Sequence, residues 1–586
     1  MNRRLALGRA ARRRLAVGLG AVLLLCLAVF VWQAWSAAHA LSKVRDQGVQ
    51  LTRELDSGQL QAATGTAEKL RDSAGSARSA TGGPLWWVGS HLPLVGKDLS
   101  AVRTSAEVLD DIAGRSLPTL LGLAREVESG DLRPHQGRID LAAVRRHTPA
   151  LRKAADAVDP AAEKMAAITQ SGLTFPFRQL VGDLQERVAG AKAAIDAAAD
   201  AFEVMPTMLG ADGPRDYLLL IQNPAEVRAS GGLPGSWAVL HADKGRLSMG
   251  AQGDGADFAT GGQPVGPTAD ESRLFGASLG TDPRDLTANP DFPRVAQMEL
   301  ALARAHGIHA QGVFSVDPVA LSYVLRGTGP VPLNGGVQLS ATNAIPYLLN
   351  TVYQTVQNAG AQNDFYAQAA RRTFDALVSG QGNQLLAIRG VVTGALQRRV
   401  FAWSSIPEVH RVIERTDITG ALPGDTGRTP QVGVFYNDGV AGKMEYYLRQ
   451  RTTAQSLGCS AGVQRIKVTT TLRSTAPGDV SGLSIFVKGN GQYAVPGHIL
   501  MQMYVYSPWH GSIESIRMSG KDVTATNGRQ RGQEVGQVAV DLAPGQSRTV
   551  TSIVRSGPGQ TGNVRVSSTP VLESIADPVT FASTCG

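Results

Sequence analysis

The chain has 586 residues, of which 43% are hydrophobic and 18% are charged, and its mean hydropathy is −0.07. This length suffices for about three domains with large buried cores, and the composition excludes both a polytopic membrane protein and a disordered chain. The net charge is +8, from 57 lysines and arginines against 49 aspartates and glutamates.

The excess positive charge lies at the N-terminus. Once six N-terminal arginines are set aside, 51 basic residues face 49 acidic ones, a net charge of +2. Because the rest of the chain is nearly neutral, a nucleic-acid partner is not expected. The six arginines precede the first apolar run with no acidic residue among them: Arg3, Arg4, Arg9, Arg12, Arg13 and Arg14.

An uncharged, mostly apolar run over residues 15–32 follows these arginines. Its length is about the 18–20 residues that a helix needs to cross a bilayer, and Trp32 and Trp35 stand where interfacial aromatic residues belong. A secretory signal peptide is the alternative, since residues 38–40 resemble a cleavage site, but its apolar region is usually only about 7–15 residues long. We therefore predict an uncleaved transmembrane helix over residues 15–35.

The positive-inside rule gives the orientation of this helix. The basic segment 1–14 is expected in the cytoplasm, and the chain after about residue 37 is expected outside. The sequence thus predicts a single-pass protein of the cytoplasmic membrane whose bulk is extracytoplasmic.

The cysteines fit this topology. Cys26 lies inside the predicted span, which leaves Cys459 and Cys585 outside. In an oxidising compartment these two could form one disulfide, and the alternative is two unpaired thiols. We favour the disulfide because chain termini fray unless they are tied down, and Cys585 is the penultimate residue.

Residues 38–205 predict a helical stalk or bundle that carries the next domain away from the membrane. The region is rich in Ala, Leu and charged residues, with apolar residues at helical spacing, as at Leu99, Val102 and Ala106. Within it, residues 82–96 contain Trp86, Trp87 and prolines and cannot be ordinary helix interior. This segment is either a turn packed against the bundle, which we favour, or an apolar loop dipping into the outer face of the membrane.

Strands alternate with helices over residues 210–400, which predicts an α/β layered domain with a parallel or mixed sheet. The expected strands are 217–221, 237–240 and 312–316, and the expected helices are 290–305, 319–325 and three segments near 342–357, 364–379 and 384–399. From residue 401 to 586 the apolar periodicity becomes two, as at Ile466, Val468 and Leu472, and turn signals recur. This pattern predicts a C-terminal β-sandwich of immunoglobulin-like size, and the fold class is α+β multidomain.

Two common catalytic signatures are missing. The sequence has no Walker A loop and no HExxH. No residue is therefore assigned a catalytic role, and whether the protein is an enzyme stays open.

Polar residues gather where the first predicted strand of the α/β domain ends. Polar side chains and glycines beside a core strand are how such domains build binding sites. Arg228 could grip a phosphate or carboxylate, and Glu226 could hold a metal or a hydroxyl. The alternative, equally weighted, is a structural turn in which Glu226 and Arg228 pair with each other and the glycines satisfy turn geometry. The candidate ligand-binding residues here are Asn223, Glu226, Arg228, Ser230, Gly231, Gly232 and Ser236.

A second mixed-charge cluster follows at residues 282–294. Such a cluster in a proline-rich loop is usually a solvated surface, but this one could complete an anionic-ligand or divalent-metal site with the first. The added candidates are Arg284, Asp285 and Arg294. If a metal is bound, Glu226 and Asp285 are its expected ligands and Mg²⁺ is the expected ion.

The segment QNPAEVRASGGLPGSWAVL resembles the signature of the domain-of-unknown-function-4012 family of bacterial membrane-anchored proteins. Further matches are DPRDLTANPDFP, GVFSVDPVALSYVLRGTGPV (312–331), NDGVAGKMEYYLR (437–449) and WWVGSHLPLVGKDL (86–99). One departure is Pro224, where the family pattern has a second Asn. The resemblance implies an envelope protein of unassigned activity.

A looser, fold-level resemblance links the chain to the LytR–CpsA–Psr enzymes, which transfer glycopolymers from polyprenyl-phosphate carriers to the cell wall. Three hypotheses follow. The first is a membrane-anchored envelope protein with an extracytoplasmic ligand-binding α/β domain. The second is a phosphotransferase in which Arg228, Arg284 and Arg294 neutralise the pyrophosphate of a lipid-linked glycan, which requires Arg228 and Arg284 to converge. The third is an adhesion or scaffold protein of the envelope.

Overall fold

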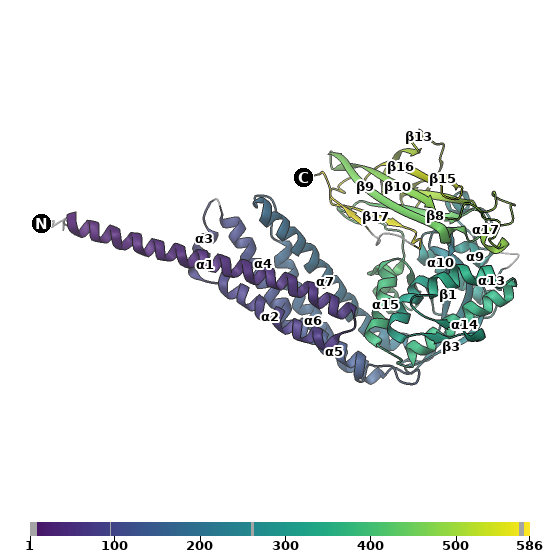
Figure 1. Ribbon diagram of the computed structural model, residues 1–586, viewed down its shortest axis with the longest axis horizontal. Helices are drawn as coiled ribbons and strands as arrows, with labels where there is room; N and C mark the ends of the chain where they lie inside the picture. The colour runs from purple at the N-terminus through teal and green to yellow at the C-terminus, as the bar shows by residue number, and fades with distance from the viewer. Residues whose placement is uncertain (1–8, 94, 260–262, 573–578, 586) are drawn as a thin grey trace. The chain divides into compact units, whose positions relative to one another are not determined.

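The computed structural model describes residues 9–93, 95–259, 263–572 and 579–585 (Figure 1). It divides into two compact units. The helical unit comprises the chain up to residue 132 together with residues 142–203, and the mixed unit comprises residues 133–141 and 204–586. The protein is thus a mixed α+β protein with helices in its N-terminal part and several sheets after them.

The helical unit consists of long helices with short connections. They are α1 (Arg9–Asp56), α2 (Leu60–Thr81), α3 (Pro84–Ser90), α4 (Gly96–Arg115), α5 (Leu117–Ser129), α6 (Leu141–Ala166) and α7 (Phe175–Met208). In α2 the buried residues Ala63, Ala67, Ala74 and Ala77 are three, four or seven positions apart. That spacing places small side chains along one face, which lets neighbouring helices approach closely.

The two adjacent tryptophans of residues 82–96 have opposite environments. Trp86 is 2% exposed, its ring lies 5.6 Å from that of Phe30 in α1, and its Nε1 donates a hydrogen bond of 3.0 Å to the carbonyl of Leu99. Trp87 is 57% exposed. The segment is therefore a short helix that packs through Trp86 and turns Trp87 outward.

The predicted transmembrane helix falls within α1. Of residues 15–24 and 27, the structure describes only the backbone, so most side chains of the predicted span lie outside the described residues. Among the residues that are described, no helix combines the length and the apolar character needed to cross a bilayer.

The mixed unit begins with a five-stranded sheet in the order β3-β2-β1-β4-β7. β1 and β4 run parallel and the other neighbours run antiparallel, so the sheet is mixed. Its strands are β1 (Arg215–Arg228), β2 (Gly231–Asp243), β3 (Arg246–Asp254), β4 (Gly312–Val316) and β7 (Val400–Ser404). The sheet thus extends four residues past the boundary predicted at residue 400.

Helices surround this sheet, and a small two-stranded sheet lies among them. The helices are α8 (Ala269–Phe275), α9 (Pro283–Leu286), α10 (Phe292–Ala305), α11 (Pro318–Thr328), α12 (Ala344–Pro346), α13 (Val352–Thr355), α14 (Ala359–Val378), α15 (Gln384–Leu396) and α16 (Pro407–Glu414). The small sheet pairs β5 (Val331–Pro332) with β6 (Gln338–Leu339). Buried residues of α10, such as Val295 and Met298, pack in one cluster with Leu218 and Leu220 of β1.

A five-stranded and a six-stranded sheet form the C-terminal part, in the orders β13-β12-β16-β10-β9 and β14-β15-β11-β8-β17-β18. Their elements are β8 (Gln431–Asp438), β9 (Leu448–Ser460), β10 (Val463–Ser474), α17 (Ile485–Lys488), β11 (Ile499–Tyr506), β12 (Ser512–Met518), β13 (Lys521–Asp522), β14 (Thr526–Gln530), β15 (Gln533–Leu542), β16 (Ser547–Arg555), β17 (Val564–Ser568) and β18 (Val579–Phe581). The alternating residues Ile466 and Val468 of β10 and Met501 and Met503 of β11 are buried in one hydrophobic cluster. The two sheets therefore share a core, while their closure into a sandwich stays a prediction.

The same cluster reaches the first sheet. It includes Ile221 and Val227 of β1 and Leu325 of α11 together with Val434 of β8. A continuous apolar core thus runs from the α/β part into the C-terminal sheets, which explains why residues 204–586 form one compact unit.

A segment that precedes α6 also belongs to the mixed unit. The backbone N–H of Gly137 donates to the carbonyl of Val378, and its own carbonyl accepts from the N–H of Leu247 at 2.7 Å. The guanidinium of Arg133 donates to the carbonyls of Gly380 and Gly382 at 2.7 and 3.0 Å. Residues 133–141 are therefore built into the mixed unit although helices of the other unit come both before and after them.

A disulfide joins Cys459 of β9 to Cys585, with the two Cα atoms 5.0 Å apart. This is the pairing that the sequence predicts. It holds Cys585 beside β9 and joins two positions that are 126 residues apart in the sequence.

We expect Cys585→Ser to lower the free energy of unfolding of the purified protein by about 2–5 kcal/mol, because the disulfide restricts a long loop in the unfolded chain. Thermal unfolding with and without reductant measures the effect. Cys26→Ser is the matched control, since Cys26 is a free thiol, and it should leave the unfolding temperature unchanged. An equal shift in both variants would contradict the expectation.

Candidate functional site

The first candidate segment is a hairpin between β1 and β2. Arg228 pairs with Gly231, so Ala229 and Ser230 form the two-residue turn. The N–H of Ser230 donates to the carbonyl of Thr287 at 3.0 Å, and its hydroxyl donates to the carbonyl of Asn289. Ser230 therefore pins the turn to the loop before α10 and is not directed at a ligand.

The two glycines are required by the hairpin itself. Gly231 has a φ of +120°, and a Cβ at Gly232 would lie 2.4 Å from the backbone of Asn223. Side chains do not fit at such distances, so the structural interpretation holds for both glycines.

A bulge in β1 explains the departure at Pro224. Asn223 pairs with Leu233 and Val227 pairs with Gly232, which leaves Pro224, Ala225 and Glu226 outside the ladder. Proline has no N–H to donate and is accepted at such an irregularity. The side chain of Asn223 closes the bulge by accepting the N–H of Ala225 at 3.0 Å.

Glu226, on this bulge, and Arg228 belong to a group of charged side chains that we call the buried charge cluster. Lys443 Nζ donates to Glu226 Oε2 at 2.9 Å, and Arg228 Nη2 lies 3.6 Å from Glu226 Oε1. Arg228 Nη1 also lies 3.9 Å from Asp438 Oδ2 at the end of β8. The members of the cluster are Glu226, Arg228, Asp438, Lys443 and Glu445.

Polar and aromatic groups complete the surroundings of the cluster. Asp438 accepts the backbone N–H groups of Val440 and Ala441 at 2.9 and 3.0 Å. Lys443 Nζ lies 4.7 Å from the centre of the Tyr353 ring, and the Tyr353 hydroxyl accepts a hydrogen bond of 2.8 Å from Asn223. Asn223 thus supports the ring on which the lysine rests.

Burial divides the acids of the cluster by protonation state. Burial alone would raise the pKa of Glu226, but the charges of Lys443 and Arg228 outweigh it and lower that pKa below its usual value. Burial raises the pKa of Asp438 to about 6, against the opposing charge of Arg228. Burial raises the pKa of Glu445 well above its usual range, and the charge of Asp438 adds to the rise. Glu226 is therefore ionised at neutral pH, whereas Glu445 keeps its proton to a higher pH than an ordinary glutamate.

The short helix α9 brings Arg284 and Asp285 to the same region. Arg284 donates two hydrogen bonds to Asp282, from Nε to Oδ1 at 3.0 Å and from Nη2 to Oδ2 at 2.5 Å. The charge of Arg284 contributes to lowering the pKa of Glu226. The pKa of Asp285 is raised by burial, although Arg228 opposes the rise. Arg228 and Arg284 thus both lower the pKa of Glu226, while each lies beside a carboxylate, Glu226 for Arg228 and Asp282 for Arg284.

Arg294 and Ser236 do not take part in this arrangement. Arg294 binds Glu271 through Nε at 2.9 Å and Nη2 at 3.0 Å and donates to the carbonyl of Gly266. Glu271 is part of the capping box of α8, so Arg294 has a structural role there. Ser236 is buried on β2, and its hydroxyl has no hydrogen-bond partner among the described residues.

The residues do not fit the expected magnesium site. Glu226 already faces Lys443 and Arg228, and two cations beside a carboxylate oppose a divalent metal. In the part of the chain that the structure describes, no group of three or more His, Cys, Asp or Glu side chains is arranged to hold a metal ion. The metal role given to Glu226 and Asp285 is therefore not supported.

Sequence reasoning missed three of the five cluster members: Asp438, Lys443 and Glu445. They lie in residues 437–449, one of the segments on which the family resemblance rests. The available signal was that Lys443 and Glu445 flank the apolar Met444, which is buried.

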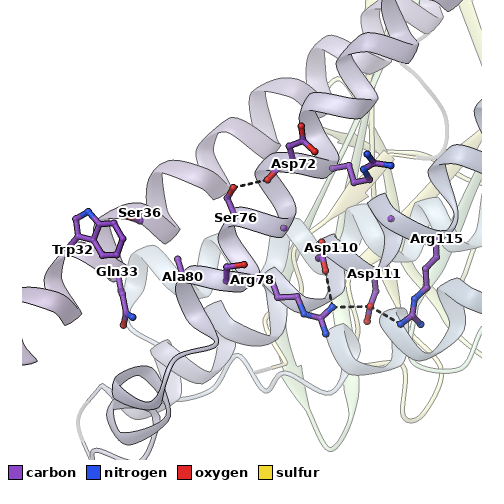
Figure 2. Close-up of a pocket in the computed structure, with 14 residues that line it drawn as sticks. Trp32, Gln33, Ser36, Asp72, Ser76, Arg78, Ala80, Asp110, Asp111 and Arg115 are labelled. Atoms are coloured by element: carbon purple, nitrogen blue, oxygen red, sulfur yellow. Dashed lines mark hydrogen bonds and ion pairs between the residues drawn. The ribbon is translucent and has the colours of Figure 1, made fainter.

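The helical unit contains a cavity of about 940 Å³ between α1, α2 and α4. Figure 2 shows Arg78 directed at Asp110 and Asp111, with Arg115 on the far side of Asp111. The N–O distances are 2.9 and 3.3 Å from Arg78 and 3.4 Å from Arg115. These acids and bases offset one another, so the cavity has no marked preference for an anion or a cation.

Comparison with known proteins places the hairpin in a family. Residues 212–353 match a family model described as "Protein of unknown function (DUF4012)". The chain carries a DUF4012 domain. The matched residues include all ten candidates between Asn223 and Arg294, whereas Asp438, Lys443 and Glu445 lie beyond the DUF4012 match.

Other comparisons add no function to the DUF4012 domain. No curated protein matches the sequence. A solved structure, the Lin1025 protein from Listeria innocua, is 10% identical and aligns over 38% of this chain and 85% of its own, with a TM-score of 0.17. That score is too low to indicate a shared fold. None of these findings supports the looser resemblance to the LytR–CpsA–Psr enzymes.

We expect Gly232→Ala to destabilise the protein by about 2–3 kcal/mol, because the added methyl group would force the β1–β2 hairpin apart. Gly235→Ala on the same strand is the matched control. A Cβ at position 235 would lie 4.0 Å from the side chain of Leu233, and no other atom outside its chain neighbours would lie closer. The free energy of unfolding of this variant should therefore stay within about 0.5 kcal/mol of the wild-type value. Chemical denaturation of both variants measures the difference, and equal stability would refute the close approach.

Glu445→Gln should change how stability depends on pH. Below the carboxyl pKa of the unfolded chain, about 4.3, Glu445 is protonated in both the folded and the unfolded state, so it adds no pH dependence to the free energy of unfolding. Above it, the unfolded state loses the proton and the folded state keeps it, so the wild type is progressively destabilised as pH rises. The unfolding free energy of the variant relative to wild type should therefore increase by up to about 1.4 kcal/mol per pH unit.

Denaturation midpoints between pH 5 and 8 measure this dependence. Glu408→Gln on the exposed start of α16 is the control and should run parallel to wild type. A Glu445→Gln profile that also runs parallel to wild type would show that Glu445 is ionised in the folded state.

Proposed function

We propose that the chain is a single-pass protein of the cytoplasmic membrane, with its N-terminus in the cytoplasm and residues after about 37 in the extracytoplasmic envelope. The observation that supports this most directly is the disulfide between Cys459 and Cys585. Disulfides persist in oxidising compartments outside the cytoplasm. The six arginines ahead of the apolar run 15–32 supply the matching orientation signal.

We further propose that the mixed unit is the functional part of this protein and that its DUF4012 domain binds a ligand. Among the cations near the buried charge cluster, Arg284 is the one that solvent reaches, since its side chain is 44% exposed against 11% for Arg228. A ligand carrying a carboxylate or phosphate would meet Arg284 first and would compete with Asp282 for it. The two C-terminal sheets, which share a core, would support this domain as a β-sandwich.

Cysteine accessibility tests the topology. In a Cys26→Ser background, Asn2→Cys and Ser57→Cys each give one free thiol, because Cys459 and Cys585 are bonded to each other. In spheroplasts, a membrane-impermeant maleimide should label Ser57→Cys, and it should label Asn2→Cys only after lysis. Equal labelling of both positions before lysis would disprove the proposed topology, as would the reverse pattern.

A further inference from the structure

One end of the helical unit is assembled around Trp86. Its ring packs with Ala37 of α1 and Val102 of α4, and Phe30 of α1 and Phe177 of α7 pack against the same cluster. The segment from α3 to α4 and the start of α7 therefore meet α1 at the level of residues 30–37. Figure 1 shows α1 continuing beyond this level, past α3, toward the N-terminus.

Large apolar side chains at this end point to solvent. Trp32 and Trp35 are each 64% exposed on α1, and Phe175 at the first position of α7 is 80% exposed. Four more lie in α3 and in the turn between α3 and α4, each about half exposed. We call these seven residues the apolar rim: Trp32, Trp35, Trp87, Val88, Leu92, Val95 and Phe175.

The two segments that carry five of the seven rim residues have basic but no acidic side chains. Residues 82–97 and 170–182 contain no Asp or Glu, and the first acidic residue of the whole chain is Asp46. The basic residues of these two segments, Lys97 and Arg178, are exposed. Exposed aromatic and aliphatic side chains bordered by lysine and arginine are typical of surfaces that lie in the headgroup region of a membrane.

The continuity of α1 indicates which surface covers the apolar rim. α1 is one helix from Arg9 to Asp56, so the apolar run 15–32 leads directly into the level at which Trp86 packs against Phe30. If that run crosses the bilayer, the helix leaves the hydrocarbon region at this level. Trp87 and Leu92, on the segment held there by Trp86, then lie at the depth of the headgroups.

We propose that the apolar rim inserts into the outer interface of the membrane that anchors the chain, so that the base of the helical unit is seated on the bilayer. This inference rests on the proposed membrane anchoring. In this arrangement, rim residues of α1, of the α3–α4 segment and of α7 contact the membrane near the point where α1 leaves it. These contacts restrict the tilt of the helical unit relative to the membrane, which a single spanning helix would leave free.

Spin labels placed on the full chain in phosphatidylethanolamine–phosphatidylglycerol vesicles test the proposal. In a Cys26→Ser background, single cysteines at Trp87 and Leu92 report the apolar rim, and Leu25→Cys reports the anchor. Ser57→Cys is the aqueous control, since it lies about 38 Å farther along the helix than Trp32 at 1.5 Å per residue. All four positions are outside the core, because Leu25, Trp87 and Leu92 are large exposed hydrophobic residues and Ser57 is exposed.

The measured quantity is the ratio of the collision rate with oxygen to the collision rate with an aqueous nickel chelate. We expect this ratio to be several-fold higher for labels at 87 and 92 than for the label at 57. The label at 25 should have the highest ratio. A lipid-exposed position 25 combined with positions 87 and 92 as aqueous as 57 would overturn the inference and keep the anchor. An aqueous position 25 would instead disprove the anchoring itself. Dipolar broadening at 87 and 92 between copies would assign the apolar rim to a second chain and also overturn the inference.

Discussion

The ion pair between Glu226 and Lys443 links two parts of the mixed unit that are far apart in the sequence. The two residues are 217 positions apart, and their 2.9 Å contact joins the bulge of β1 to the loop after β8. Both side chains are almost removed from water, so the pair stabilises the fold only as long as both partners are present. Asn223, Tyr353 and Arg228 are arranged around that pair, and the common apolar core brings its two halves together.

Local pattern predicted the elements well and their long-range pairing poorly. The strand at residues 312–316 has the bounds that the sequence predicts, because a short apolar run there is followed by Asp-Pro, which starts a helix. The partners of Glu226 could not be predicted, because no local periodicity tells which distant loop supplies a cation. For the same reason Gly231 and Gly232 fitted a ligand loop and a tight hairpin equally well until the position of Asn223 was known.

The helical unit shows a second limit of sequence patterns. Trp86 and Trp87 are neighbours, yet one is buried against α1 and the other is exposed, because consecutive residues of a helix point about 100° apart. Only the phase of α3 relative to α1 decides which ring is buried. Packing against the bundle, which we favoured for this segment, therefore holds for Trp86, whereas Trp87 leaves an apolar ring exposed.

The inserted segment 133–141 affects how the chain responds to proteolysis and how it folds during synthesis. The chain passes between the two units three times, near residues 132, 141 and 203. A cut at residue 203 would leave the two units joined through residues 133–141. The backbone hydrogen bonds of Gly137 and the guanidinium of Arg133 keep that segment in the mixed unit. During synthesis, this segment emerges long before the strands that receive it, so it must wait unpaired while α6 and α7 form.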